Sequence, residues 1–285
     1  MRLVLTNILV GAVLSAAMLS FGARPAAAAD DAALLAADHG FMQAAANPDA
    51  AALGKLLDAD FVWIDAKGKL GNRAQVLAGT WRPAINDLGP DTPNARRQDY
   101  GQVEVVQTDG GKMHVLRVWV KRPEGWRALV YQEVQSIDVL PKVTPSASQE
   151  CHNPCKSVPY TPKTDTQRAV IDAYRRLETS AMTHNAADWD VHTGEEFIAA
   201  SSYSDRLLDK PTRLGELRRA NMAGLAPTPL ASAQLFEFGD VVVMRSRHVP
   251  DQGKPLEVTR VWVKRDGKWV ETASYQTAVQ GGGSS

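Results

Sequence analysis

The sequence has few of the features that identify a known kind of active site. Its 285 residues include only 2 cysteines, and its 6 histidines are scattered without the spacing of a metal site. Phosphate-binding glycine loops, the Gly-x-Ser-x-Gly turn of hydrolases, the His-Glu-x-x-His motif and EF-hand loops do not occur. Nucleotide, dinucleotide, zinc and calcium chemistry therefore lack their usual signals, and we expect neither a metal nor a cofactor.

An excess of charge of one sign is also missing. The 32 Lys and Arg residues balance 32 Asp and Glu residues, so that the formal net charge is +0. Nucleic acids and anionic membrane surfaces attract proteins through an excess of positive charge. We therefore expect no nucleic-acid partner and no attachment to a membrane surface.

The one long apolar run lies at the amino terminus. Residues 3–21 are apolar apart from a few small polar side chains, they follow Arg2, and they lead to an alanine-rich run that ends before Asp30. This pattern is typical of a cleaved secretory signal peptide, and an uncleaved anchor is the alternative. We predict that residues 1–29 are a signal peptide, cleaved after Ala28 or Ala29, and that the mature protein is periplasmic or secreted. No later run reaches the roughly 18 apolar residues of a membrane span.

The remaining sequence contains one internal repeat. The segment Arg-Val-Trp-Val-Lys-Arg occurs at 117–122 and again at 260–265, an offset of 260 − 117 = 143 residues. A Tyr-Gln pair follows each segment, at 131–132 and at 275–276, with one extra residue in the second copy. Unless a bulge absorbs it, that residue moves Gln276 to the sheet face opposite to that of Gln132, so that the two copies would not hold equivalent pockets.

The repeat divides the chain into domains. We assign the first copy to 30–140, the second copy to 165–280, and a flexible Gly/Ser tail to 281–285. The proline-rich segment 141–164 is the expected linker. It contains Cys151 and Cys155, which we predict to form a disulfide in an oxidising compartment; a redox pair or a metal site that includes His152 is the alternative.

Each copy begins with helix-forming sequence and ends with strands. We expect a second helix capped by Asn47 in the first copy and by Asn185 in the second. The apolar strands that follow are separated by turns such as Asp109-Gly110 and Asp266-Gly267, which indicate antiparallel hairpins. This order is typical of an α+β fold in which helices cover one face of a curved sheet.

The motifs of the first copy resemble a known superfamily. Phe61-Val62-Trp63-x-Asp65, Gly68, an Arg73-Ala74-x-x-Leu77 helix and the closing Arg-Val-Trp hairpin are similar to those of nuclear transport factor 2-like proteins, and within them to SnoaL-like, ketosteroid-isomerase-like domains of unknown function. The resemblance covers about 31–138 and 166–279. It implies two cone-shaped domains, each with helices packed on a strongly curved antiparallel sheet and often with a pocket at its open end. It also implies that the two copies pair through their sheets.

Two arginines are candidates for ligand binding. Arg117 and Arg260 each lie two residues before a strand tryptophan and so share its sheet face. Either they anchor an acidic ligand group beside an apolar wall, or they pack on aromatic surface where the copies meet. The full set of candidate ligand-binding residues is Trp63, Arg117, Trp119, Tyr131, Arg260, Trp262 and Tyr275.

Catalysis is the other use of such a pocket. The resemblance implies an Asp or His base and a Tyr or Asp donor in an apolar cone, but no catalytic motif of those enzymes aligns with this sequence. The candidate catalytic residues are Asp65, His39, Tyr131, His184 and Asp190. For Asp65 the alternative is a carboxylate that closes the turn after its strand, and for His184 it is a cation at a helix end.

Three functions fit these observations. The first is an exported protein that binds a small apolar or weakly acidic molecule in a cone pocket. The second is a cofactor-independent isomerase, dehydratase or cyclase of the SnoaL-like type, and the third is a protein-interaction module that uses an exposed sheet face. An open pocket separates the first two from the third, and a carboxyl group with a shifted pKa inside that pocket separates the second from the first.

Overall fold

A computed structural model of the chain describes residues 24–47, 49–79, 81–84, 93–138, 150–219, 227–251 and 253–281. The predicted signal segment up to residue 23, the linker residues 139–149 and the tail from 282 onward lie outside the described residues. Within them, the chain forms two units with the same order of elements, and the prediction of two α+β units is confirmed.

The first unit consists of α1 (Arg24–Ala46), α2 (Ala50–Leu56), β1 (Leu57–Ile64), β2 (Leu70–Asn72), α3 (Arg73–Ala78), β3 (Ala95–Asp99), β4 (Val103–Asp109), β5 (Met113–Arg122) and β6 (Gly125–Gln135). The second consists of α4 (Asp165–Met182), α5 (Ala186–Val191), β7 (Thr193–Ser201), β8 (Leu208–Asp209), α6 (Lys210–Leu217), β9 (Leu230–Phe238), β10 (Val241–His248), β11 (Leu256–Arg265) and β12 (Lys268–Ala278).

Each unit builds a six-stranded sheet of the same topology, β2-β1-β6-β5-β4-β3 and β8-β7-β12-β11-β10-β9. The last four strands of each unit form an antiparallel meander, as predicted. The first strand, in contrast, runs parallel to the last, so that the sheets are mixed rather than wholly antiparallel. This pairing joins strands far apart in sequence, and no local turn signal announces it.

Local sequence explains where the shorter helices begin. Asn185 caps α5 as predicted, and its side chain accepts a hydrogen bond from the Asp188 backbone nitrogen at 3.1 Å. The prediction for α2 was wrong by two residues. Asp49 is the cap in place of Asn47, because its carboxylate accepts from two free backbone N–H groups, at 3.0 and 2.9 Å, and lies at the positive end of the helix.

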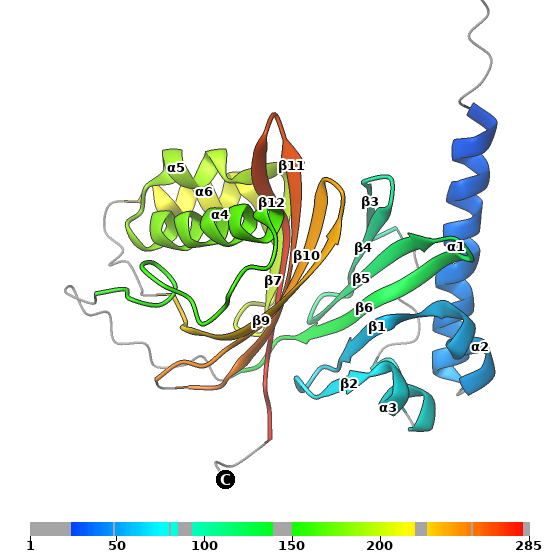
Figure 1. The fold of residues 1–285 in the computed structure, drawn as a ribbon. Coiled ribbons are helices and arrows are strands. Elements are labelled where there is room, and N and C mark those ends of the chain that lie inside the picture. The colour runs from blue at the N-terminus through cyan, green and yellow to red at the C-terminus, as the bar shows by residue number, and fades with distance from the viewer. Residues whose placement is uncertain are drawn as a thin grey trace, which may run out of the picture.

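The two sheets pack face to face, and the helices cover their outer faces (Figure 1). Along β5, Arg117 and Trp119 point to the helices of the first unit, whereas Leu116, Val118 and Val120 point to the second sheet. Because both faces are buried, β5 is an almost continuous apolar run.

Polar contacts join the two sheets as well. Gln132 Nε2 donates to the Tyr275 carbonyl oxygen at 3.1 Å, and Thr277 Oγ1 donates to the Glu133 carbonyl oxygen at 2.6 Å. Tyr100 donates its hydroxyl proton to Glu196 at 2.9 Å. The two copies therefore pair within one chain.

The residues just after the predicted cleavage site are held against the first sheet. Asp30 accepts from Lys121 Nζ at 2.6 Å and from Trp126 Nε1 at 3.2 Å, and Asp31 forms an ion pair with Arg97 at 2.5 Å. The predicted cleavage site itself falls inside α1. Among the described helices, none is both long and apolar enough to cross a membrane.

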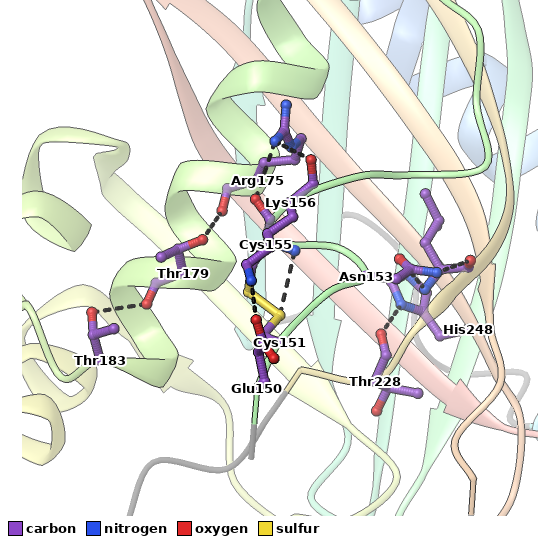
Figure 2. Close-up of a disulfide and its surroundings, with 11 residues drawn as sticks. Glu150, Cys151, Asn153, Cys155, Lys156, Arg175, Thr179, Thr183, Thr228 and His248 are labelled. Carbon is purple, nitrogen blue, oxygen red and sulfur yellow. Dashed lines mark hydrogen bonds and ion pairs between the residues drawn. A yellow bond between two sulfur atoms is a disulfide. The ribbon is translucent and has the colours of Figure 1, made fainter. Parts of the chain in front are cut away.

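The predicted disulfide joins Cys151 and Cys155 at the start of the second unit (Figure 2). Between them, the Asn153 side chain donates to the Leu230 carbonyl oxygen at 2.8 Å and accepts from the Leu230 nitrogen at 3.1 Å. From α4, Arg175 donates to the Cys155 carbonyl oxygen at 3.2 Å. The disulfide loop is thus fastened to both a strand and a helix of the second unit.

Candidate functional site

A cavity of about 710 Å³ lies in the second unit, between its helices and its sheet. This volume falls within the roughly 300–1,000 Å³ of pockets that bind small molecules. Its apolar lining residues are Leu177, Ala181, Trp189, Phe197, Ala199, Ala200, Leu207 and Leu208. Its polar lining residues are Glu178, Ser201, Ser204, Arg206, Thr212, Arg213, Glu216, Arg219, Arg260, Glu271, Ser274 and Gln276.

Aromatic side chains fill the corresponding space of the first unit. The ring of Phe41 lies 5.8 Å from that of Trp63, 6.0 Å from that of Trp119 and 5.5 Å from that of Tyr131. Trp63 and Tyr131 are themselves 4.2 Å apart, and all four side chains are fully buried. The first cone therefore ends in a packed aromatic core.

Strand register explains why one cone is filled and the other is open. Arg117 pairs with Tyr131 across β5 and β6, and Arg260 pairs with Ser274 across β11 and β12. On the next strand, the partner of Tyr131 is Trp63, whereas the partner of Ser274 is Ala199. The second unit thus has two small side chains where the first has two large aromatic ones, and both Ala199 and Ser274 line the cavity.

The same register separates the two Tyr-Gln pairs. A bulge interrupts the ladder at the same place in both units, so that it does not absorb the extra residue of the second copy. Tyr131 therefore belongs to the core beneath the first helices, whereas Tyr275 belongs to the apolar layer between the sheets. The counterpart of Tyr131 is Ser274 and not Tyr275, and the cones are not equivalent.

Arg260 forms a buried ionic cluster at the inner end of the cavity. Its Nε lies 3.0 Å from a Glu271 carboxylate oxygen, and one terminal nitrogen donates to Glu178 at 2.7 Å. The guanidinium also stacks on Tyr174, 5.0 Å from the ring centroid. The Arg260 and Glu271 side chains are 5% and 3% exposed, so water screens this cluster poorly.

Glu271 has the pKa of a group that exchanges protons near neutrality. Burial, together with the nearby carboxylate of Glu178 and against the opposing attraction of Arg260, raises the pKa of Glu271 to about 8. The position is specific to the second unit, because its counterpart opposite Trp119 is Ala128. In this carboxyl group, burial therefore favours the protonated form, whereas the contact with Arg260 favours the carboxylate.

His248 supports Arg260 from the side away from the cavity. Its Nδ1 lies 3.0 Å from the Thr228 carbonyl oxygen (Figure 2), and its Nε2 lies 3.2 Å from a terminal nitrogen of Arg260. A neutral ring with the proton on Nδ1 satisfies both contacts, since Nε2 then accepts from the guanidinium. Burial and the charge of Arg260 lower the pKa of His248 to about 3, which is consistent with the neutral form.

Two buried carboxylates of the first unit, Asp38 and Glu133, are each held by two or more donors instead. Asp38 accepts from Arg117 Nε at 2.8 Å and from Trp119 Nε1 at 2.7 Å. Glu133 accepts from the Tyr131 hydroxyl at 2.9 Å and from the Ala66 backbone nitrogen at 3.0 Å. These groups hold the filled cone together.

The predicted ligand-binding residues lie in four environments. Arg260 borders the cavity. Trp63, Arg117, Trp119 and Tyr131 are packed in the filled cone, Trp262 lies in the core of the second unit, and Tyr275 lies between the sheets. Neither arginine side chain lies where the two copies meet, because each points toward the helices of its own unit.

The predicted catalytic residues do not converge on one site. Asp65 closes the turn after β1, where it accepts from the backbone nitrogens of Lys67 and Lys69 at 2.9 and 2.8 Å. His39 is exposed on α1, and His184 follows α4 in a left-handed conformation with φ 53°. Asp190 forms an ion pair with Lys210 at 2.7 Å. No cluster of three or more potential metal ligands occurs in the described part of the chain.

Sequence reasoning missed Glu178, Glu271 and Ser274. The repeat itself contained the signal for two of them, because the offset of 143 that aligns the tryptophans also aligns Ala128 with Glu271 and Tyr131 with Ser274. The contact between Glu178 and Arg260 joins residues 82 positions apart, and no local pattern predicts it.

No protein-family model matches the sequence, and no curated protein matches it either. Several solved structures match in fold. One is a nuclear transport factor 2-like protein from Cytophaga hutchinsonii, with a TM-score of 0.35, 17% identity, and coverage of 40% of this chain and 99% of that one.

Two further solved structures match with similar TM-scores and coverage. A nuclear transport factor 2-like protein of unknown function from Silicibacter pomeroyi has a TM-score of 0.34 and 11% identity, and it covers 41% of this chain and 99% of that one. The CamKII hub homology domain of Chlamydomonas reinhardtii has a TM-score of 0.32 and 17% identity, and it covers 41% and 100%. Each of these matches covers about as much of this chain as one unit.

Proposed function

We propose that the protein binds a small molecule in the cone of the second unit. The observation that carries this proposal is the replacement of the Trp63 and Tyr131 pair by Ala199 and Ser274, which leaves a cavity of about 710 Å³. Protein interiors are otherwise filled to the density of organic crystals, so that an opening of this size between helices and sheet is unusual. A function in ligand binding accounts for it.

The first unit has a supporting role in this proposal. Its cone is packed with aromatic side chains, and its sheet covers the face of the second sheet that the helices leave bare. Because each sheet covers the other, the described residues leave no broad sheet face free for a protein partner. This arrangement favours ligand binding over the interaction module.

Acid–base catalysis is the second candidate, and Glu271 is the observation that favours it. Its carboxyl group borders the cavity, its pKa is raised to about 8 by burial, and Arg260 orients it at 3.0 Å. A carboxylic acid that exchanges its proton near neutral pH suits the isomerisation, dehydration or cyclisation of a bound molecule without a cofactor. The catalytic residue is then Glu271, with Arg260 as its positioning residue.

We also propose that the protein functions outside the cytoplasm, after removal of residues 1–29. The disulfide supports this location, since such bonds persist in oxidising compartments. The contacts of Asp30 and Asp31 with the first sheet mean that a chain starting at Asp30 keeps an anchored amino terminus.

Native mass spectrometry of the protein, purified gently from its own host, tests the binding proposal. We expect a small molecule to be retained at one copy per chain by the wild type and to be lost from the double variant Ala199→Trp, Ser274→Tyr, which reproduces the filled first cone. Ala187→Trp is the matched control, because it adds the same indole at an exposed position of α5. Equal retention by the wild type and the double variant would place the ligand elsewhere and contradict the proposal.

A further inference from the structure

The mouth of the cavity carries several arginines. Arg206 comes from the turn between β7 and β8, Arg213 from α6, and Arg219 from the residues after α6; all three line the cavity. They lie toward solvent, since Arg206 and Arg219 are exposed and Arg213 is half-buried. The inner end is different, because Arg260, Glu271 and Ser274 are buried there.

These arginines are only partly neutralised. Arg213 forms an ion pair with Glu216 at 3.0 Å, and the side chain of Arg206 lies 3.8 Å from its neighbour Asp205. Arg219 has no carboxylate within ion-pair distance among the described residues. The lining residues of the mouth thus comprise three arginines and one carboxylate, Glu216, which leaves an excess of positive charge.

Arg260 at the inner end, in contrast, already has three partners within the protein. Arg260 uses its three nitrogens on Glu271, Glu178 and His248, so that an incoming anion would have to displace one of them. Displacing Glu178 would leave a half-buried carboxylate without its partner, which is costly. An acidic group is therefore better accommodated at the mouth than at the inner end.

The inner end offers hydrogen bonds instead of free charge. Ser274 lines this end from β12, opposite Ala199 on β7, whereas Gln276 and Ser201 lie two residues further along, next to the β7–β8 turn. Glu271 borders the same space, and its carboxyl group can take part in a hydrogen bond in either protonation state. Leu177, Trp189 and Phe197 contribute an apolar wall to the cavity.

We propose that the cavity takes an amphipathic organic acid, with its anionic group at Arg213 and Arg219, an apolar middle along Trp189 and Phe197, and a hydroxyl or carbonyl oxygen at Glu271 and Ser274. This inference rests on the proposed binding function and specifies its ligand class. It also assigns the acid-binding role to the mouth arginines rather than to Arg260.

Three matched probes test the orientation by isothermal titration calorimetry: ω-hydroxydecanoic acid, decanoic acid and the terminal decanediol. The wild type should bind the hydroxy acid about tenfold more tightly than the diol, because charge-assisted hydrogen bonds to arginine strengthen binding. Added salt should reduce that preference, since the mouth is exposed to solvent. The wild type should also bind the hydroxy acid more tightly than decanoic acid, and Ser274→Ala should remove this difference in affinity.

Substitutions of the mouth arginines test which end of the ligand they bind. Arg213→Gln with Arg219→Gln should abolish the preference for the acid and leave the affinity for the diol unchanged. Arg168→Gln is the matched control, because this arginine of α4 is 62% exposed and does not line the cavity. If Arg168→Gln also loses affinity for the acid, the effect is one of overall charge. That result would overturn the placement of the anionic group at the mouth arginines.

The results with these probes separate a failure of the proposed ligand orientation from a failure of the proposed binding function on which it rests. If the diol binds as tightly as the hydroxy acid, and the Ala199→Trp, Ser274→Tyr variant abolishes both, the cavity binds ligands but the acid-at-the-mouth orientation is wrong. If no probe binds the wild type better than that filled variant, both the orientation and the binding function fail.

Discussion

Ser274 occupies in the second sheet the position that Tyr131 occupies in the first, each opposite the buried arginine of its unit. The neighbouring strand repeats the contrast, with Ala199 opposite Ser274 and Trp63 opposite Tyr131. Two pairs of residues therefore account for the difference between a packed cone and an open one. The duplicated fold thus has one copy whose cone is filled and one whose cone is open.

Opening the first cone should destabilise the protein. Trp63→Ala removes a fully buried indole that contacts Phe41 and Tyr131, and substitutions of this kind cost about 3–5 kcal/mol. Urea unfolding measures the loss, with Ala199→Gly in the open cone as the comparison. A loss below about 1 kcal/mol for Trp63→Ala would mean that its surroundings collapse onto the space, contrary to a rigid aromatic core.

The pKa of Glu271 predicts a specific pH dependence of stability. The folded protein holds a proton at this carboxyl group up to about pH 8, whereas the unfolded chain releases it near 4.5. Between these values the free energy of unfolding should fall as pH rises, by up to about 1.4 kcal/mol per pH unit. Above pH 8 this contribution is constant.

Glu271→Gln isolates that contribution. The neutral amide keeps the shape of the protonated side chain, so the variant should lose the decline between pH 4.5 and 8 and gain stability over the wild type at pH 8. Denaturant unfolding at a series of pH values gives the comparison, with Glu124→Gln at an exposed turn as the control. Parallel curves for the wild type and Glu271→Gln would show that the carboxyl group titrates normally in the folded protein.

The disulfide should make a moderate contribution to stability. Its cysteines are only four positions apart, and closing so short a loop restricts the unfolded chain by about 2 kcal/mol. The Cys151→Ser, Cys155→Ser variant should lose roughly that amount in urea unfolding. An unchanged free energy of unfolding would indicate that the contacts of Asn153 and Arg175 hold the segment without the bond.

The amino terminus of the exported protein is open to direct measurement. Intact mass spectrometry of the protein from its host should find a chain that begins at Ala29 or Asp30, outside the cytoplasm. The double variant Ala28→Lys, Ala29→Lys should block cleavage at both predicted bonds, because signal peptidase requires a small residue directly before the bond. A full-length chain in the cytoplasm would contradict the export proposal.

Hairpin signals predicted most of the sheet. Strands β4 to β6 and β9 to β12 form the antiparallel hairpins that the apolar runs and the Gly-containing turns predicted. The edge strand β3 (Ala95–Asp99) was missed, since its sequence Ala-Arg-Arg-Gln-Asp is polar and only partly buried. The parallel pairing of β1 with β6 was missed because it depends on the tertiary fold.

The candidate site was less predictable than the fold. Arg260 was found because it belongs to the most obvious repeated segment. The Tyr-Gln pairs directed attention to Tyr275, although the constant offset pointed to Ser274. The mouth arginines were not predicted, because Arg206 and Arg213 meet only when the β7–β8 turn and α6 fold over the same opening.

The most direct test of the account is the number of binding sites per chain. An apolar fluorescent probe such as N-phenyl-1-naphthylamine should titrate to one site per chain in the wild type and in Ala187→Trp, and to none in the Ala199→Trp, Ser274→Tyr variant. Circular dichroism and urea unfolding should confirm that all three proteins are folded. Two sites per chain, or unchanged binding in the filled variant, would contradict the conclusion that the second cone alone is the ligand site.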